Sequence, residues 1–232
     1  MSKRNEAALA ALHNYYPDAA TRLSEKIAGL NKENKVFDGW REEQLHKFIY
    51  VLKINAEELE RGFTEKKAAT TAWAARNILE LDVWIEYCNL SDSHAKRFKD
   101  DSMRDLIGAF NIIISMVTEL NGKKEAAWDQ AQQAVEKGGQ SLGIADTKYL
   151  QVHDAAEELG RRNKFTLVNR IYSKFAHPTA WVVDSALGAV SSEDICEAFF
   201  ASGVISATQT LTKIHEHLEQ RIEAQAVKVG SS

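Results

Sequence analysis

The chain has 232 residues, of which 44% are hydrophobic, and a formal net charge of -4 at pH 7. A chain of this length can bury roughly 70% of the surface that it exposes when unfolded, so we expect one main domain with a sizeable core. The small negative charge excludes a global attraction to nucleic acid or acidic membranes, so any anion site must be a local basic patch. The two cysteines, Cys88 and Cys196, have neither disulfide-framework nor metal-site spacing, which indicates a reducing compartment.

The distribution of helix-forming and helix-breaking residues predicts an all-α fold. Long stretches rich in Ala, Leu, Glu and Lys contain only 2 Pro, Pro17 and Pro178, and this balance leaves few turns for a sheet. The first residues lack the apolar run of a signal peptide, and the longest apolar segment, 106–117, is too short to span a bilayer. The sequence therefore predicts a cytoplasmic protein without a membrane segment.

The N-terminal residues 1–35 predict a small helical unit, with helices over about 6–15 and 18–28. The polar run 31–35 separates this unit from a second domain, residues 36–228. We expect the N-terminal helices to be a candidate docking surface for a protein partner.

Hydrophobic periodicity predicts the helices of the second domain. Gly62 is expected to end one helix and Thr64 to cap the next, and Gly160 is expected to end a later one. The nearly continuous apolarity of 100–120 predicts that this segment is the central helix. The predicted helices span about 39–61, 64–89, 91–98, 100–120, 123–137, 149–159, 161–176 and 192–226, with a mobile loop at 138–147 and an irregular stretch after 178.

The predicted helix 161–176 carries the residues with the most distinctive chemistry. Arg170 and His177 are seven residues apart and therefore lie on one helix face, with Ser173 between them. Pro178 stops the helix, which places His177 at a C-terminus, where unpaired carbonyls favour a positive imidazole. A guanidinium that holds a phosphate beside an imidazole that moves a proton is a candidate catalytic pair for phosphodiester cleavage.

A structural role for the same pair needs no substrate. Chance alone predicts about one such Arg/His spacing in this composition, and Arg41 with His46 forms another. From the residues alone we favour the structural interpretation, in which His177 caps its helix and Arg170 is a surface charge. Glu43 and His46 have the spacing of a di-iron ligand pair but lack a second pair, so no metal ligands and no cofactors are predicted.

A resemblance to a known family adds to this interpretation. The run 75–80, which contains Arg76 and Glu80, and the later motif Tyr172-Ser173-x3-His177-Pro178 resemble a bacterial branch of the HEPN superfamily over about residues 64–180. The resemblance implies an antiparallel helical bundle, here with extra N-terminal helices. It also implies kinship with metal-independent ribonucleases of toxin-antitoxin and phage-defence systems, in which the Arg/His motifs of a homodimer share one cleft. Other members are inactive scaffolds, and Ile171 stands where many active members have a polar residue.

The two motifs can be joined physically. Arg76 and Glu80 are one turn apart on an otherwise apolar helix. If that helix packs against 161–176, a polar pocket would form or, equally, a buried network that only fixes helix register. The supporting residues of this cluster would be Arg76, Glu80, Tyr172 and Ser173 around His177.

Two functions therefore remain open. One is an endoribonuclease in which His177 moves the proton, Arg170 stabilises the phosphate, and the basic residues Arg161, Arg162 and Lys164 guide the RNA backbone. The other is a non-catalytic helical protein that binds a partner or senses a ligand. Arg170 and His177 that both reach solvent in one cleft, ideally across a two-fold axis from their mates, favour the first function. A His177 buried against Glu80 favours the second.

Overall fold

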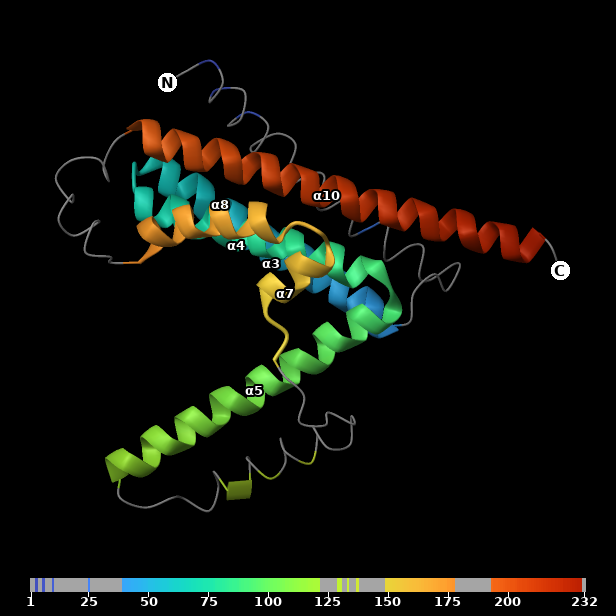
Figure 1. Ribbon diagram of the computed structural model, residues 1–232, viewed down its shortest axis with the longest axis horizontal. Coiled ribbons are helices and arrows are strands. Elements are labelled where there is room, and N and C mark those ends of the chain that lie inside the picture. The colour runs from blue at the N-terminus through green and yellow to red at the C-terminus, as the bar shows by residue number, and fades with distance from the viewer. Residues whose placement is uncertain are drawn as a thin grey trace.

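The computed structural model describes residues 39–121, 149–177 and 193–230, with isolated positions within 3–25 and 129–137. The described segments form six helices and contain no strand (Figure 1). The helices are α3 (Gly39–Thr64), α4 (Ala68–Leu90), α5 (Asp92–Asn121), α7 (Val152–Glu158), α8 (Arg162–Ala176) and α10 (Glu193–Gly230). The all-α prediction is confirmed. The predicted helices at 6–15, 18–28 and 123–137, the loop at 138–147 and the irregular stretch after 178 lie outside the continuously described segments.

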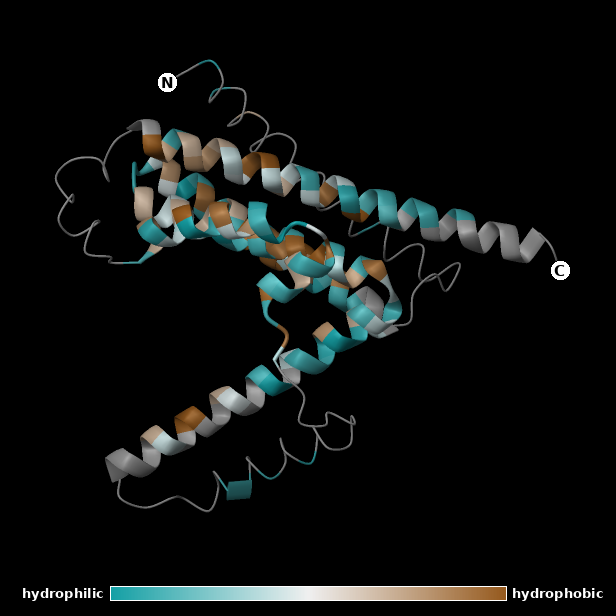
Figure 2. Cartoon of the chain, viewed as in Figure 1, coloured by the Kyte–Doolittle hydropathy of each residue, from teal (hydrophilic) through white to brown (hydrophobic). Residues whose placement is uncertain are grey.

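Helix α4 is the central element of the described fold. It contacts α3, α5, α7, α8 and α10, and its buried side chains lie on more than one face. Small residues such as Ala72, Ala74 and Ala75 allow neighbouring backbones to approach from several sides, while Ile78 and Ile85 fill the space between them. Figure 2 shows the hydrophobic colour gathered where these helices meet.

The prediction that 100–120 is the central helix is wrong. Its exposed apolar side chains include Ile112, Ile113 and Met116, and this end of α5 points away from the other described helices (Figure 1). Apolar residues alone do not make a helix central, because they do not specify which other helices pack against them.

Helix α5 runs without the break that the sequence predicts. The sequence predicts separate helices over 91–98 and 100–120, but one helix includes both. An ion pair between Lys96 and Asp100 spans the expected break, and the Phe98 ring packs against Phe48 and Trp84. The continuous helix therefore has both a local pair and a tertiary contact at this point.

The turn between α3 and α4 corrects two further predictions. Gly62 lies inside α3, and Thr64 is its last residue instead of the cap of α4. The turn is a Schellman motif, in which the Lys66 amide donates to Phe63 and the Lys67 amide to Gly62. Lys66 has a φ of 56°. A Cβ at Gly62 would lie 2.8 Å from the Thr71 nitrogen, so this glycine permits close approach between the two helices.

Gly160 ends α7 as predicted. Its φ is 69°, and the motif is again of the Schellman type, with the Gly160 amide donating to Glu157 and the Arg161 amide to Ala156. Helix α8 follows at once. Because the turn is tight, Arg161 is held close to α4 at the start of α8.

Helices α8 and α10 run antiparallel on α4. Phe175 packs against Phe199, the Tyr172 hydroxyl donates to Ser202, and Arg161 and Lys213 both bind Asp82. Helix α10 also packs closely on α3, where a Cβ at Gly203 would lie 2.6 Å from a methyl carbon of Leu59. None of the helices in the described part of the chain is long and apolar enough to cross a membrane.

Candidate functional site

The polar cluster predicted between α4 and α8 is present at the C-terminal end of α8. Nη1 of Arg76 lies 3.0 Å from Nε2 of His177. Nε of the same guanidinium donates to Oε1 of Glu80, at 3.0 Å, and to Oδ1 of Asn169, also at 3.0 Å. We call Arg76, Glu80, Asn169 and His177 the α4/α8 cluster. One arginine therefore joins two helices and orients the imidazole.

His177 sits just beyond the end of α8 in an extended conformation, with φ −118° and ψ 149°. Pro178 explains this conformation, because a proline ring disfavours α geometry in the residue before it. The side chain of His177 is exposed. Its imidazole contacts Arg76 and forms no described hydrogen bond with Glu80. The imidazole is therefore accessible to a ligand.

The contact with Arg76 specifies the tautomer of His177. A guanidinium has only N–H donors, so Nε2 of His177 must accept this hydrogen bond. A hydrogen bond of this kind leaves the ring proton on Nδ1. An anion that drew the Arg76 guanidinium toward itself would release the Nε2 lone pair for proton transfer.

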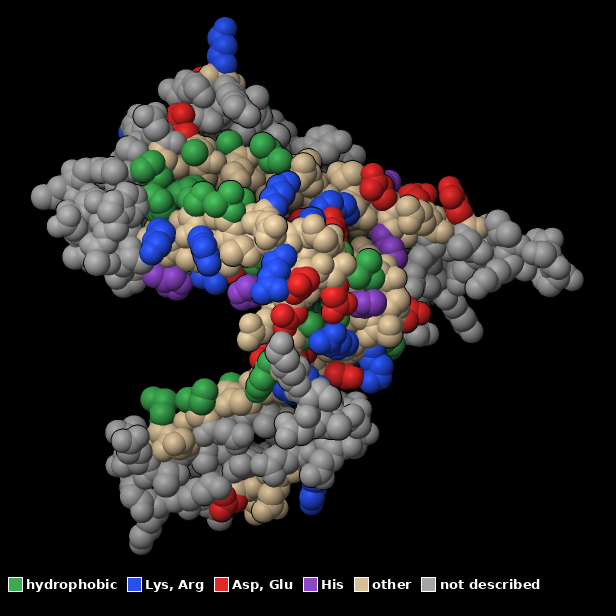
Figure 3. All heavy atoms as spheres, in the orientation of Figure 1, with side chains coloured by type: hydrophobic (Ala, Val, Ile, Leu, Met, Phe, Trp, Pro, Cys, Tyr) green, Lys and Arg blue, Asp and Glu red, His purple; other side chains and the backbone are tan. Residues whose placement is uncertain are grey.

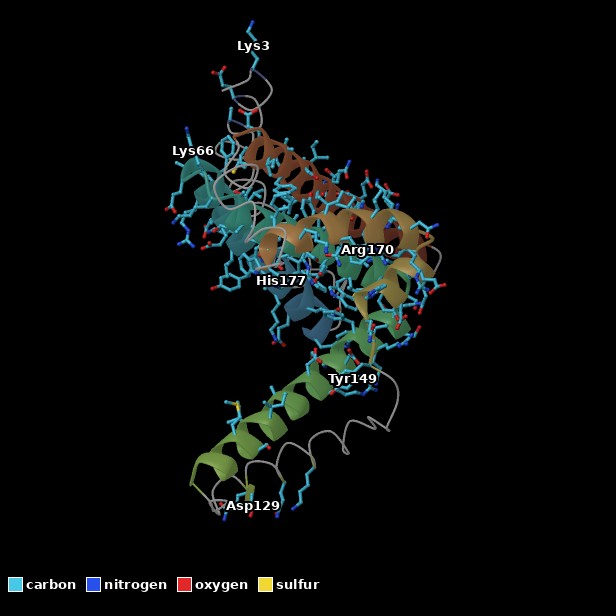
Figure 4. The ribbon with its side chains drawn as sticks, turned by 60° about the vertical axis from the view of Figure 1, so that its left-hand side comes forward. Lys3, Lys66, Asp129, Tyr149, Arg170 and His177 are labelled. Carbon is cyan, nitrogen blue, oxygen red and sulfur yellow. The ribbon has the colours of Figure 1, made fainter. Side chains whose placement is uncertain are left out.

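Arg170 lies apart from this hydrogen-bonded group. Figure 4 shows it part-way along α8, whereas His177 lies at the C-terminal end. Arg170 is exposed and borders a hollow of about 470 Å³, together with His153, Arg162 and Asn169 of the cluster. The two residues of the predicted catalytic pair are both open to solvent, but the described hydrogen bonds pair His177 with Arg76.

Tyr172 and Ser173 do not line the α4/α8 cluster in the way that the sequence suggests. The Tyr172 ring is buried against Phe199, and its hydroxyl donates to Oγ of Ser202 on α10. Burial raises the pKa of Tyr172 above its usual value. The Ser173 hydroxyl donates to the Asn169 carbonyl at 2.7 Å, within α8. Tyr172 therefore fastens α8 to α10, and Ser173 supports the turn that carries Asn169.

Asn169 is the member of the cluster that sequence reasoning missed. It precedes Arg170 in the chain and lies one turn before Ser173 on α8. Asn169 lies four residues before Ser173 on the same face of α8, and this i,i+4 spacing could have identified it. Its signal is weak because a single asparagine within a helix has no distinctive spacing.

The three residues predicted to guide RNA lie in different surroundings. Arg161 turns inward, where Nη1 lies 3.0 Å from Oδ2 of Asp82 and Nη2 lies 2.7 Å from Oε2 of Glu86. Arg162 forms an exposed ion pair with Glu157. Lys164 is exposed and has no ionic or hydrogen-bond partner among the described residues. Lys164 is therefore the most available cation of the three.

Arg161 belongs to a second charged group that we call the α4/α10 network. Asp82 is 6% exposed and accepts from Arg161, from the Thr210 hydroxyl at 3.0 Å and from Lys213 at 2.9 Å. Lys213 also pairs with Glu86. Two cations and two anions thus neutralise one another where α8 and α10 both meet α4, which is the arrangement that a buried charge requires.

Among the described residues, no three or more His, Cys, Asp or Glu side chains gather in a way that could hold a metal ion. Comparisons of the chain with protein-family models, with curated proteins and with solved structures found no match.

Proposed function

We propose that the protein is a metal-independent endoribonuclease of the HEPN type, in which the α4/α8 cluster handles an RNA phosphodiester. One observation carries the proposal: an exposed imidazole, His177, lies 3.0 Å from a guanidinium, Arg76, that Glu80 and Asn169 hold in place. Imidazole supplies proton transfer near neutral pH, and guanidinium supplies a permanent charge for the phosphate. The biological setting would be a toxin-antitoxin or phage-defence system, as the family resemblance implies.

The proposed reaction needs only these two groups and water. The RNA phosphate draws the Arg76 guanidinium, which frees Nε2 of His177. Nε2 then takes the proton of a 2′-hydroxyl as the 2′-oxygen attacks phosphorus. The bond from phosphorus to the 5′-oxygen breaks, and that oxygen takes a proton from water. The imidazolium of His177 gives its proton to the hydroxide that is left, and a 2′,3′-cyclic phosphate remains. Arg76 stabilises the charge on the pentacoordinate phosphate.

Arg170 has a supporting place in this proposal. It is exposed on α8, seven residues before His177, and would bind a neighbouring phosphate of the same strand. Lys164, with no described partner, would extend the basic path along the helix. These contacts account for RNA recognition without a strongly basic chain.

A homodimer is part of the proposal. Leu167 and Ile171 are 64% and 46% exposed, and they lie one turn apart on the face of α8 beside Arg170. Two copies of this stripe packed together would shield the leucine and the isoleucine and bring both copies of Arg170 to one cleft. Replacement of both by glutamate should convert the dimer to a monomer in analytical ultracentrifugation.

The test is cleavage of labelled RNA in the presence of EDTA. His177→Gln should abolish cleavage, and Arg76→Gln should reduce it at least about 100-fold, the usual scale for loss of one transition-state donor. His215→Gln is the matched control, because His215 is an exposed histidine far along α10. Cleavage that persists in folded His177→Gln protein would refute the nuclease proposal.

A second function is favoured by a specific observation. In the described arrangement Nε2 of His177 is already occupied by Arg76, and Glu80 offsets the guanidinium charge. A cluster that satisfies itself in this way can serve only to hold α8 against α4. The protein would then be a non-catalytic helical module for a partner or a ligand. Absence of RNA cleavage and of RNA binding in the wild-type protein would favour this function.

A further inference from the structure

A groove between α8 and α10 contains no residue of the α4/α8 cluster. It has a volume of about 620 Å³, within the usual range of roughly 300–1,000 Å³ for small-molecule sites. Its floor is α4, and α8 and α10 form its two walls. Figure 3 shows apolar side chains gathered between α8 and α10, with Lys and Arg side chains along α8.

The groove has an apolar middle. Leu79 and Val83 lie on its floor, Phe165 and Val168 on the α8 wall and Ile205 on the α10 wall. Ile205 is 48% exposed. The end toward the start of α10 is restricted, because the Tyr172 hydroxyl donates to Ser202 across the two walls. An apolar body seated here would cover surface that water now contacts.

The two ends of the groove differ in charge. The antiparallel pairing of the walls, with Phe175 beside Phe199 and Arg161 and Lys213 sharing Asp82, places Lys164 opposite Gln209. An ammonium and a carboxamide can both donate to one carboxylate. Neither side chain has a partner among the described residues.

The end of the groove at Lys164 has an excess of positive charge, because the acidic side chains of the groove are either neutralised or distant. Asp82 is neutralised by Arg161 and Lys213. Glu197 lines the opposite end, twelve positions before Gln209 on α10. At a rise of about 1.5 Å per residue this is roughly 18 Å, which exceeds the Debye length at physiological ionic strength. Glu197 therefore does not prevent a carboxylate from binding beside Lys164. It would repel a carboxylate placed at its own end of the groove, so the ligand binds in one direction.

We propose that this groove binds a small amphipathic carboxylate, with its head between Lys164 and Gln209 and its apolar body along Val168 and Ile205. The chemical class is that of a medium-chain fatty acid or another linear apolar acid. The groove shares Lys164 with the proposed RNA path, but no member of the α4/α8 cluster lines it.

Calorimetric titration of the full chain with decanoate, decanol and decylamine tests the proposal. Decanoate should bind in a one-to-one ratio, and more tightly than the neutral and cationic probes. Lys164→Gln should weaken decanoate binding about tenfold, the effect of losing one exposed charge-assisted hydrogen bond, and should leave decanol binding unchanged. Lys174→Gln is the matched control, because Lys174 lies on α8 but does not line the groove.

A second variant separates the groove from nonspecific binding. Ala201→Trp places an indole within the groove and should abolish binding of all three probes, while far-UV circular dichroism confirms that the helices are retained. Binding of decanoate that is unchanged in both Lys164→Gln and Ala201→Trp would overturn the proposal. Equal affinity for decanoate and decylamine would overturn the assigned position of the head. Either result leaves the RNA cleavage test unaffected.

Discussion

Two charged groups on α4 are built from similar residues and differ in accessibility. The α4/α10 network centres on Asp82, which is almost fully buried and is held by cations from two other helices. The α4/α8 cluster centres on Arg76, whose side chain is 26% exposed, and it ends on the exposed His177. The comparison indicates that the first group fastens the bundle, whereas the second keeps an imidazole within reach of solvent.

The largest expected effect is the loss of stability when the α4/α10 network is broken. Asp82→Ala leaves Arg161 and Lys213 without their shared anion, so the free energy of unfolding should fall by about 3–5 kcal/mol. Urea unfolding followed by far-UV circular dichroism measures this loss. The control is Glu43→Ala, which removes an exposed pair with Lys47 and should lower the free energy of unfolding far less. Similar losses in the two variants would refute the assigned role of the network.

The joint between α8 and α10 gives a smaller, pH-dependent effect. Burial raises the pKa of Tyr172 above its usual 10.0, so the unfolded chain loses this proton at a lower pH than the folded chain. The stability that neutral Tyr172 contributes is therefore complete below pH 10 and is lost as the pH rises through its folded pKa. Burial also raises the pKa of Tyr87, so a second tyrosine acts in the same direction.

Tyr172→Phe tests this joint. The variant should lose about 1 kcal/mol at pH 7, because it lacks the hydrogen bond to Ser202. It should also lose stability less steeply than the wild type above pH 10. Chemical unfolding at a series of pH values between 7 and 11 measures both effects. Parallel curves for the two proteins would show that Tyr172 ionises equally in the folded and unfolded states.

The sequence predicted the elements better than their roles. The Gly160 turn and the extended His177 before Pro178 follow from local rules, because left-handed backbone favours glycine and proline restricts the residue before it. The positions of Gly62 and of the central helix depend on how closely neighbouring helices approach. Periodicity reports that a face is apolar, but it does not report which helix covers that face.

The candidate site shows the same division. Arg76, Glu80 and His177 could be grouped from their motifs, and the structure brings them together. Asn169 was missed, and Tyr172 was assigned to the wrong side of α8 because the motif spacing does not specify its rotation. Arg161 was predicted to be a surface cation, but its partners on α4 are 79 and 75 positions away in the sequence, 161 − 82 and 161 − 86. Such distant pairs have no local signature.

The exposed cluster should contribute little to stability. Asn169→Ala removes one half-buried hydrogen bond to Arg76 and should lower the free energy of unfolding by about 1 kcal/mol. Glu80→Gln removes a partly exposed ion pair and should cost less than about 1 kcal/mol, with a smaller cost at high salt. Urea unfolding at low and high ionic strength measures these changes. A loss as large as that of Asp82→Ala would make the cluster a structural joint and weaken the nuclease proposal.

The smallest effect concerns a single proton on His177. The hydrogen bond from Arg76 requires that Nε2 accept and that Nδ1 carry the proton. Nitrogen-15 NMR of the imidazole should therefore report a neutral Nδ1–H tautomer in the wild type. Arg76→Met, which cannot donate, should remove this preference, while His215 stays unchanged as the internal control. A 2′-deoxy oligonucleotide, which cannot be cleaved, should shift the wild-type signal toward that of Arg76→Met, because its phosphate draws the guanidinium away. If the oligonucleotide does not change the nitrogen-15 signal of His177, phosphate does not displace Arg76. That result favours the non-catalytic function.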